Sequence, residues 1–175
     1  MAASIQTTLS GLARALVQQG RIKEAEAESF STAGAAAGGF VNQVIASGRL
    51  NARELARFAS DTFGYPLLDI SAYDDERIAR DAIDRKLIQT HQVVALAKRG
   101  NRIVVALADP TNLRALDEIR FQTGLAVDPI VAEADKLAAI VVRLLETTET
   151  KLNDLAGDDF DLELVEQRTL DGHTQ

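Results

Sequence analysis

The chain has 175 residues, of which 46% are hydrophobic and 26% charged, a balance typical of folded domains rather than disordered chains. It contains no cysteine and only two histidines, which excludes disulfides and thiol catalysis and argues against an all-protein metal site. No stretch approaches 18 apolar residues and the start lacks a cationic region, so we expect a cytoplasmic chain without membrane insertion or signal peptide.

The net charge of −7 is concentrated at the C-terminal end. Residues 1–70 are neutral and residues 71–148 carry a net charge of −1, whereas residues 149–175 hold two basic and eight acidic residues. The absence of a basic stripe argues against a nucleic-acid partner. We predict an acidic flexible linker over 149–175, leading toward a missing ATPase core; the alternative is a disordered natural C-terminus.

A helical pattern repeats at a spacing of 28 residues in the first part of the chain. Residues 12–22 and 40–50 both read apolar-x-x-x-apolar-apolar-x-x-Gly-Arg-apolar. Gly20 and Gly48 suit the left-handed position that ends a helix, because glycine has no Cβ to strain there. We predict a helical-hairpin repeat domain over 1–70, with plain helix packing as the alternative.

The second part of the chain has mixed periodicity. We expect, in chain order, a broken helical stretch, a β-hairpin, a helix, a third strand and an amphipathic helix: 71–90, 92–97 with 102–108, 112–124, 127–132, and from 135 onward. In the first full helix Leu113, Leu116 and Ile119 are expected to face inward, and Pro129 indicates an edge strand. The order β-β-α-β-α predicts a small, sandwich-like α+β domain over 71–148.

Catalytic motifs are missing from the sequence. It has no Gly-x-x-x-x-Gly-Lys-[Ser/Thr] loop, no Gly-x-Ser-x-Gly and no His-Glu-x-x-His. His91 has no partner identifiable from the sequence that would orient it as a base, so we interpret it as structural. We therefore predict no catalytic residue and no metal ligand.

Four short motifs occur in an order that is specific as a set: FGYPLLDI at 63–70, RGNR at 99–102, DPTN at 109–112 and FQTG at 121–124. Over roughly residues 9–146 the chain resembles the N-terminal (MshEN) region of PilB-type ATPases of type IV pilus assembly. The resemblance implies the regulatory front end of a cytoplasmic, homohexameric motor for twitching motility. ATP and Mg would bind only to the missing core, so this fragment would not be an enzyme.

In that family the front domain binds cyclic di-GMP through a tandem motif, Arg-Leu-Gly-x-x-Leu-x-x-x-Gly. Here Gly11 and Gly39 stand in place of arginine, and Ala13 and Val41 in place of the first glycine. Without arginine for charge and stacking, we expect no cofactor in this fragment. The retained frame and nearby arginines are Leu12, Leu16, Gly20, Phe40, Val44, Gly48, Arg14 and Arg49.

The resemblance leaves three functions open. The first is a docking module for a PilZ-family regulatory protein that couples pilus assembly to cyclic di-GMP. The second is direct sensing of cyclic di-GMP, and the third is mechanical docking on the inner-membrane platform proteins of the pilus. Interfaces prefer apolar and aromatic anchors, and the candidates are Leu9, Leu12, Leu16, Phe58, Phe63 and Tyr65. The alternative for each candidate is ordinary core packing.

Overall fold

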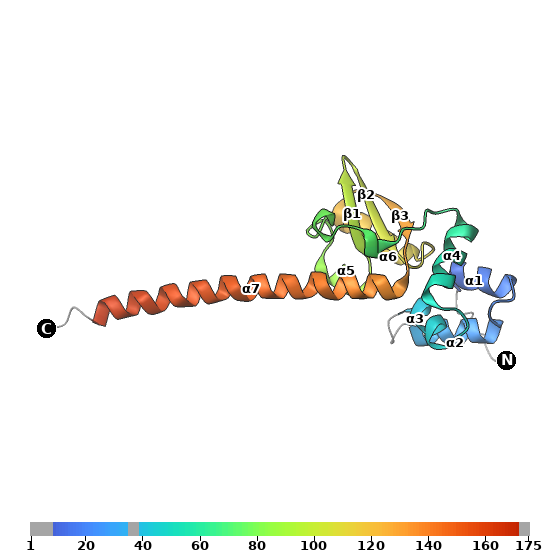
Figure 1. Ribbon diagram of the computed structural model, residues 1–175, viewed down its shortest axis with the longest axis horizontal. Coiled ribbons are helices and arrows are strands. Elements are labelled where there is room, and N and C mark those ends of the chain that lie inside the picture. The colour runs from blue at the N-terminus through green and yellow to red at the C-terminus, as the bar shows by residue number, and fades with distance from the viewer. Residues whose placement is uncertain (1–8, 35–38, 172–175) are drawn as a thin grey trace, which may run out of the picture. The chain divides into compact units, whose positions relative to one another are not determined.

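The computed structural model describes residues 9–34 and 39–171 (Figure 1). Its contacts divide the chain into two units, one up to residue 141 and one from residue 142. The first unit combines helices with a small three-stranded sheet.

The N-terminal part of the first unit contains the helices α1 (Gly11–Gln18), α2 (Glu24–Gly34), α3 (Phe40–Ala46) and α4 (Ala52–Phe63). Helix α4 begins with a capping box, in which Asn51 and Glu54 each accept the other's backbone N–H. Gly20 and Gly48 have φ angles of 70° and 76°, the left-handed values expected after the first helix of each repeat.

These four helices enclose one apolar core. It is formed by the buried side chains of Leu12, Leu16, Ile22, Ala27, Val44, Leu50, Leu55, Ala56, Ala59 and Val131. Ile22 and Leu50, the apolar residues after the two glycines, are 4% and 2% exposed. Each therefore closes the core beneath the helix that precedes it.

The sheet follows a short irregular segment, which contains two 3₁₀ turns and α5: Ile70–Ala72, Asp75–Arg77 and Arg85–His91. The strands are β1 (Val94–Arg99), β2 (Arg102–Leu107) and β3 (Ala126–Val131), with α6 (Leu113–Thr123) between β2 and β3. The order is β1-β2-β3, where β1 and β2 form an antiparallel hairpin and β2 and β3 run parallel. Mixed helices and a small sheet agree with the expected fold class.

Strand β3 lies at one end of the sheet, as Pro129 predicted. Proline has no N–H for a second neighbour. Beyond β3 the chain adds only a short bridge: the Leu68 N–H donates to the Val131 carbonyl, and the Val131 N–H donates to the Pro66 carbonyl, both at 2.9 Å.

Two predictions about local structure were wrong. Leu113 is 68% exposed rather than inward, because it lies in the first turn of α6 and the buried face is formed by Leu116, Ile119 and their neighbours. Most of 71–90 is not α-helical. The Asp69 and Asp74 side chains accept backbone N–H groups two residues ahead, and such local bonds favour turns over helix.

The structure places the expected domain boundaries differently. The boundary at residue 70 falls inside the first unit, because Val131 of β3 packs in the helical core. The boundary at 148 falls inside a single helix, α7 (Ala134–Asp171), where we expected a linker to begin. Residues 142–156 contain no proline or glycine, so nothing in their sequence ends the helix. Linker flexibility stays a prediction.

Candidate functional site

The six predicted docking residues all belong to the helical core or pack against it. Leu12 and Leu16 are 0% exposed, so they do not reach a partner's surface, and their assignment as contacts was wrong. Both lie on the face of α1 that packs inward. The other four are half-buried against the same core and keep some surface: Leu9, Phe58, Phe63 and Tyr65.

The two glycines that replace the motif arginines have structural roles. A Cβ built on Gly11 would lie 3.0 Å from Cγ2 of Thr111, closer than packed side chains normally approach. Gly39 has a φ of 101°, a backbone conformation that disfavours any residue with a Cβ. An arginine at either position would require the backbone or its neighbours to move.

The remaining motif positions are framework residues. Val44 is 0% exposed and Phe40 packs against the helical core. Ala13, where the motif has glycine, is also 0% exposed. The hydrophobic pattern shared with the nucleotide motif is therefore accounted for by core packing.

The two candidate cations are in different environments. Arg14 is exposed on α1. The Arg49 guanidinium pairs with Glu26, so this arginine already has an acidic partner between the two repeats. The Lys23 N–H and then the Arg49 guanidinium hold the pKa of the Glu26 carboxyl below its usual range.

A hydrogen-bonded junction joins α1 to the loop before α6. The Leu12 N–H donates to Thr111 Oγ1 at 2.9 Å, and the Thr111 hydroxyl donates to the Asp109 carboxylate at 2.5 Å. The Thr111 N–H donates to the same carboxylate oxygen at 2.8 Å. Removal from water raises the pKa of Asp109, and the two bonds from Thr111 oppose that shift. Asn112 caps α6, so the DPTN motif has a structural role.

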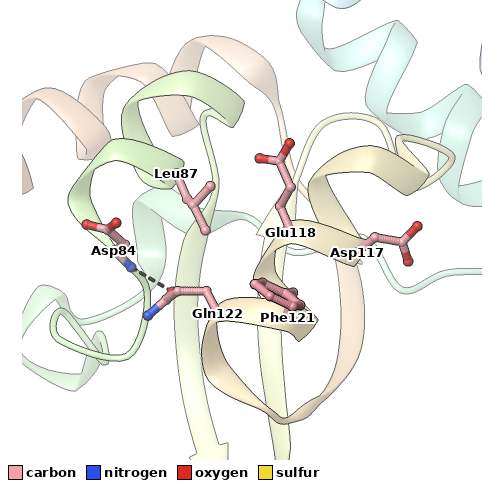
Figure 2. Close-up of a pocket in the computed structure, with 6 residues that line it drawn as sticks. All are labelled: Asp84, Leu87, Asp117, Glu118, Phe121 and Gln122. Atoms are coloured by element: carbon pink, nitrogen blue, oxygen red, sulfur yellow. Dashed lines mark hydrogen bonds between the residues drawn. The ribbon is translucent and has the colours of Figure 1, made fainter.

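An open pocket of about 520 Å³ lies between α5 and α6 (Figure 2). Its lining is Asp84, Leu87, Asp117, Glu118, Phe121 and Gln122. Phe121 is 94% exposed, the largest exposed fraction among the large apolar residues with described side chains, in 9–33, 39–147 and 149–156.

From the sequence, Phe121 was noted only as part of the FQTG motif, and the pocket was not predicted. The usable signal was helical position: Phe121 is two residues from the buried Ile119, and residues two apart point about 200° apart on a helix. The partner of His91 was likewise not predicted from the sequence. Its ring Nε2 lies 2.7 Å from Glu118 Oε2, 27 residues along the chain, and this pair joins α5 to α6.

Among the side chains that the structure describes, in 9–33, 39–147 and 149–156, no group of three or more His, Asp or Glu is placed to hold a metal ion. No helix in that part of the chain is both long and apolar enough to cross a membrane.

Comparison with known protein families identifies the family of this chain. The MshEN domain family matches residues 63–151. The chain belongs to this family. The MshEN match covers the α5–α6 pocket and begins after the tandem helical pattern.

Relatives of this MshEN chain include type IV pilus assembly ATPases PilB. The Pseudomonas aeruginosa protein is 35% identical over 168 residues, which are 95% of this chain and 29% of that protein. The Acinetobacter baylyi protein is 36% identical over 136 residues, 75% of this chain and 23% of that one. The chain thus spans less than a third of the length of these relatives.

Two solved structures share the MshEN fold of this chain. The N-terminal domain of XpsE has a TM-score of 0.58 at 21% identity, covering 75% of this chain and 92% of that one. MshE, solved with cdg, has a TM-score of 0.53 at 20% identity, covering 76% and 97%. At these identities the likeness concerns the fold alone.

Proposed function

We propose that this chain is the non-catalytic regulatory front end of a PilB-type pilus ATPase, and that it docks a PilZ-family protein which carries the cyclic di-GMP signal. The relatives are PilB ATPases, and the chain covers their N-terminal family domain rather than their full length. In this proposal the hexameric, ATP-hydrolysing core lies outside the chain, and the whole protein works at the cytoplasmic side of the pilus platform.

One observation favours docking over direct nucleotide sensing: glycine stands where the motif has arginine, in backbone and packing environments that disfavour a side chain. Gly11 packs against Thr111 and Gly39 has a positive φ, so neither position presents a cation to a phosphate. Arg49 is also exposed but already pairs with Glu26, so Arg14 is the arginine that a direct-binding model would use. Losing arginine contacts to a charged ligand costs about 1.5–3 kcal/mol each.

The docking surface in this proposal comprises the half-buried residues at the edge of the helical core. Phe58 lies on α4, Phe63 ends it, and Tyr65 follows the Gly64 cap. Partly exposed aromatic side chains provide large contact area at low entropic cost. The Tyr65 carbonyl accepts the Ser60 hydroxyl at 2.6 Å, which fixes the backbone that carries this ring.

The second candidate function is direct binding of cyclic di-GMP. The solved structure of MshE with cdg is the observation that motivates it. It predicts that the nucleotide binds the isolated chain and that Arg14→Ala weakens binding. The docking proposal predicts no binding of nucleotide to the chain alone.

Calorimetry of the chain with a cognate PilZ-family protein, first without nucleotide, tests the proposal. We expect a one-to-one complex at micromolar affinity or tighter, about −8 kcal/mol. Tyr65→Ala should weaken it, whereas Leu113→Ala, an exposed apolar residue on α6 outside the α5–α6 pocket, serves as the control. An absence of binding, with both variants folded by circular dichroism, would contradict docking; cyclic di-GMP and the platform proteins are then the next titrants.

A further inference from the structure

The pocket between α5 and α6 has an apolar centre and an acidic rim. Leu87 from α5 and Phe121 from α6 supply the apolar surface, and three carboxylates surround it: Asp84, Asp117 and Glu118 (Figure 2). We propose that this pocket binds a cationic, arginine-bearing segment of a partner protein. The proposal is independent of the proposed function, because none of these residues lies in the helical part.

The pocket is already formed in the structure. The Asp84 N–H donates to Gln122 Oε1 at 2.9 Å, and His91 Nε2 lies 2.7 Å from Glu118, so two bonds tie α5 to α6. In the sequence, Leu87 lies between these two bonded residues, Asp84 at the N-cap of α5 and His91 at its end. Little conformational entropy is therefore lost in ordering the pocket when a ligand binds, and this favours binding.

Phe121 provides the strongest contact that the pocket offers. With 94% of its surface exposed, it can be covered by a partner without disturbing the core, which α6 completes through Leu116 and Ile119. A phenyl face attracts cations through its quadrupole, and a guanidinium stacks on it more readily than an ammonium does. A single exposed aromatic residue does not by itself indicate a binding site. Phe121, however, borders a pocket that also holds negative charge.

The rim carboxylates differ in how far they are already neutralised. Glu118 pairs with His91 and with Arg114, at 3.1 Å for the latter, and these partners lower its pKa. Asp117 lies 3.5 Å from Arg120, one turn away on the same helix, with both side chains well exposed, so this pair is weak.

Asp84 begins α5 without its side chain accepting a capping bond. Asp84 and Asp117 therefore hold the negative charge that a partner's cation meets at this pocket.

Charge complementarity selects the occupant. The chain's own residues 149–175 carry eight acidic and two basic residues, so the acidic rim repels them. It repels phosphate-bearing ligands for the same reason. Arginine satisfies both features of the pocket at once, since its planar head stacks on a ring while its N–H groups donate to carboxylates.

Nuclear magnetic resonance with a defined probe tests this proposal. The chain labelled with ¹⁵N is titrated with the synthetic peptide acetyl-Leu-Arg-Leu-Arg-amide. We expect shifts confined to the amides of Leu87 and Phe121 and the side-chain amide of Gln122, and weaker binding as salt rises from about 50 mM to about 500 mM. The matched peptide with glutamate in place of arginine should cause no shifts.

Variants separate the ring from the charges. Phe121→Ala should weaken peptide binding about two- to thirty-fold, whereas Leu113→Ala, 68% exposed on the same helix but outside the pocket, should leave it unchanged. Asp84→Asn combined with Asp117→Asn should weaken it further, and Asp61→Asn on α4 should not. All five positions are exposed, so each variant should melt at the wild-type temperature.

Three results would overturn the proposal. One is an absence of shifts in the pocket at millimolar peptide. Another is equal binding of the arginine peptide to wild type and to Phe121→Ala. The third is a concentration-dependent dimer in sedimentation velocity that Phe121→Ala abolishes, because the occupant would then be a second copy of this chain.

Discussion

The backbone N–H of Leu12 donates a 2.9 Å hydrogen bond to Oγ1 of Thr111, 99 residues further along the chain. This bond satisfies an N–H in the first turn of α1, which has no partner within its own helix. Because the Thr111 hydroxyl in turn donates to Asp109, one side chain links the helical part to the DPTN loop. Together with Val131 in the helical core, this link joins the helices to the sheet within the unit up to residue 141.

Thr111→Val should destabilise the fold by about 1–3 kcal/mol, because the Leu12 N–H and the Asp109 carboxylate each lose a partner at a part-buried site. Urea unfolding followed by circular dichroism measures this change. Thr150→Val is the control, since the exposed Thr150 hydroxyl bonds only the carbonyl one turn back in α7. Equal effects of the two substitutions would contradict a special role for Thr111.

The raised pKa of Asp109 predicts a pH dependence of stability. Its folded-state pKa lies above the unfolded value of 3.8, so its stabilising contribution is full below pH 3.8 and is lost as pH rises through the folded-state pKa. We compare the free energies of unfolding of wild type and Asp109→Asn across pH, since the amide does not titrate. The wild-type value should fall relative to the variant with rising pH.

Other carboxylates with shifted pKa values do not affect the comparison of wild type with Asp109→Asn. The pKa values of Asp69 and Glu118 are lowered by hydrogen bonds from Ser71 and His91 respectively, so their contributions are lost as pH falls below their usual range. Both groups are present in both chains and cancel in the difference. A wild-type free energy of unfolding that rises relative to that of Asp109→Asn with rising pH would contradict the assignment of Asp109.

Gly11→Ala should destabilise the protein by about 1–3 kcal/mol, because the new Cβ would press on Thr111 Cγ2 at 3.0 Å. The sign is diagnostic, since glycine to alanine within a helix ordinarily stabilises by about 0.5–1 kcal/mol. Thermal melting measures the change, with Gln18→Ala at the exposed end of α1 as control. A gain in stability would show that α1 moves away from Thr111 without cost.

Leu16→Ala should cost about 2–5 kcal/mol, as expected for a leucine with no exposed surface. The half-buried Val17 beside it is the matched comparison, and Val17→Ala should cost less. Denaturant unfolding gives both values. If Leu16→Ala left stability intact and removed binding of the PilZ-family protein, our reassignment of Leu16 from contact to core would be wrong.

A chain ending at residue 148 should keep the fold of its first unit, because that unit's contacts are internal to residues up to 141. Amide chemical shifts of β1 to β3 compare the two chains directly. Agreement within the sheet would support the prediction that 149–175 acts as a linker. Shifts that spread through the sheet would contradict it.

Local sequence determined the elements whose causes are local. The helix ends at Gly20 and Gly48 depend on residues a few positions apart, so pattern alone located them. Pro129 likewise indicated an edge strand, since a missing N–H excludes a central position wherever the strand lies. Where local side-chain bonds competed with helix, as at Asp69 and Asp74, the pattern misled.

Only the tertiary structure decided which side chains meet. Leu12 reads equally well as a core residue or as a docking residue until its 0% exposure is seen. The close contact that disfavours a side chain at position 11 comes from Thr111, and the partner of His91 is Glu118 on another helix. Such pairs are determined by packing between segments that are far apart in the chain. A single sequence does not contain the distances between these segments. Exposure of Phe121 is a property of the assembled surface in the same way.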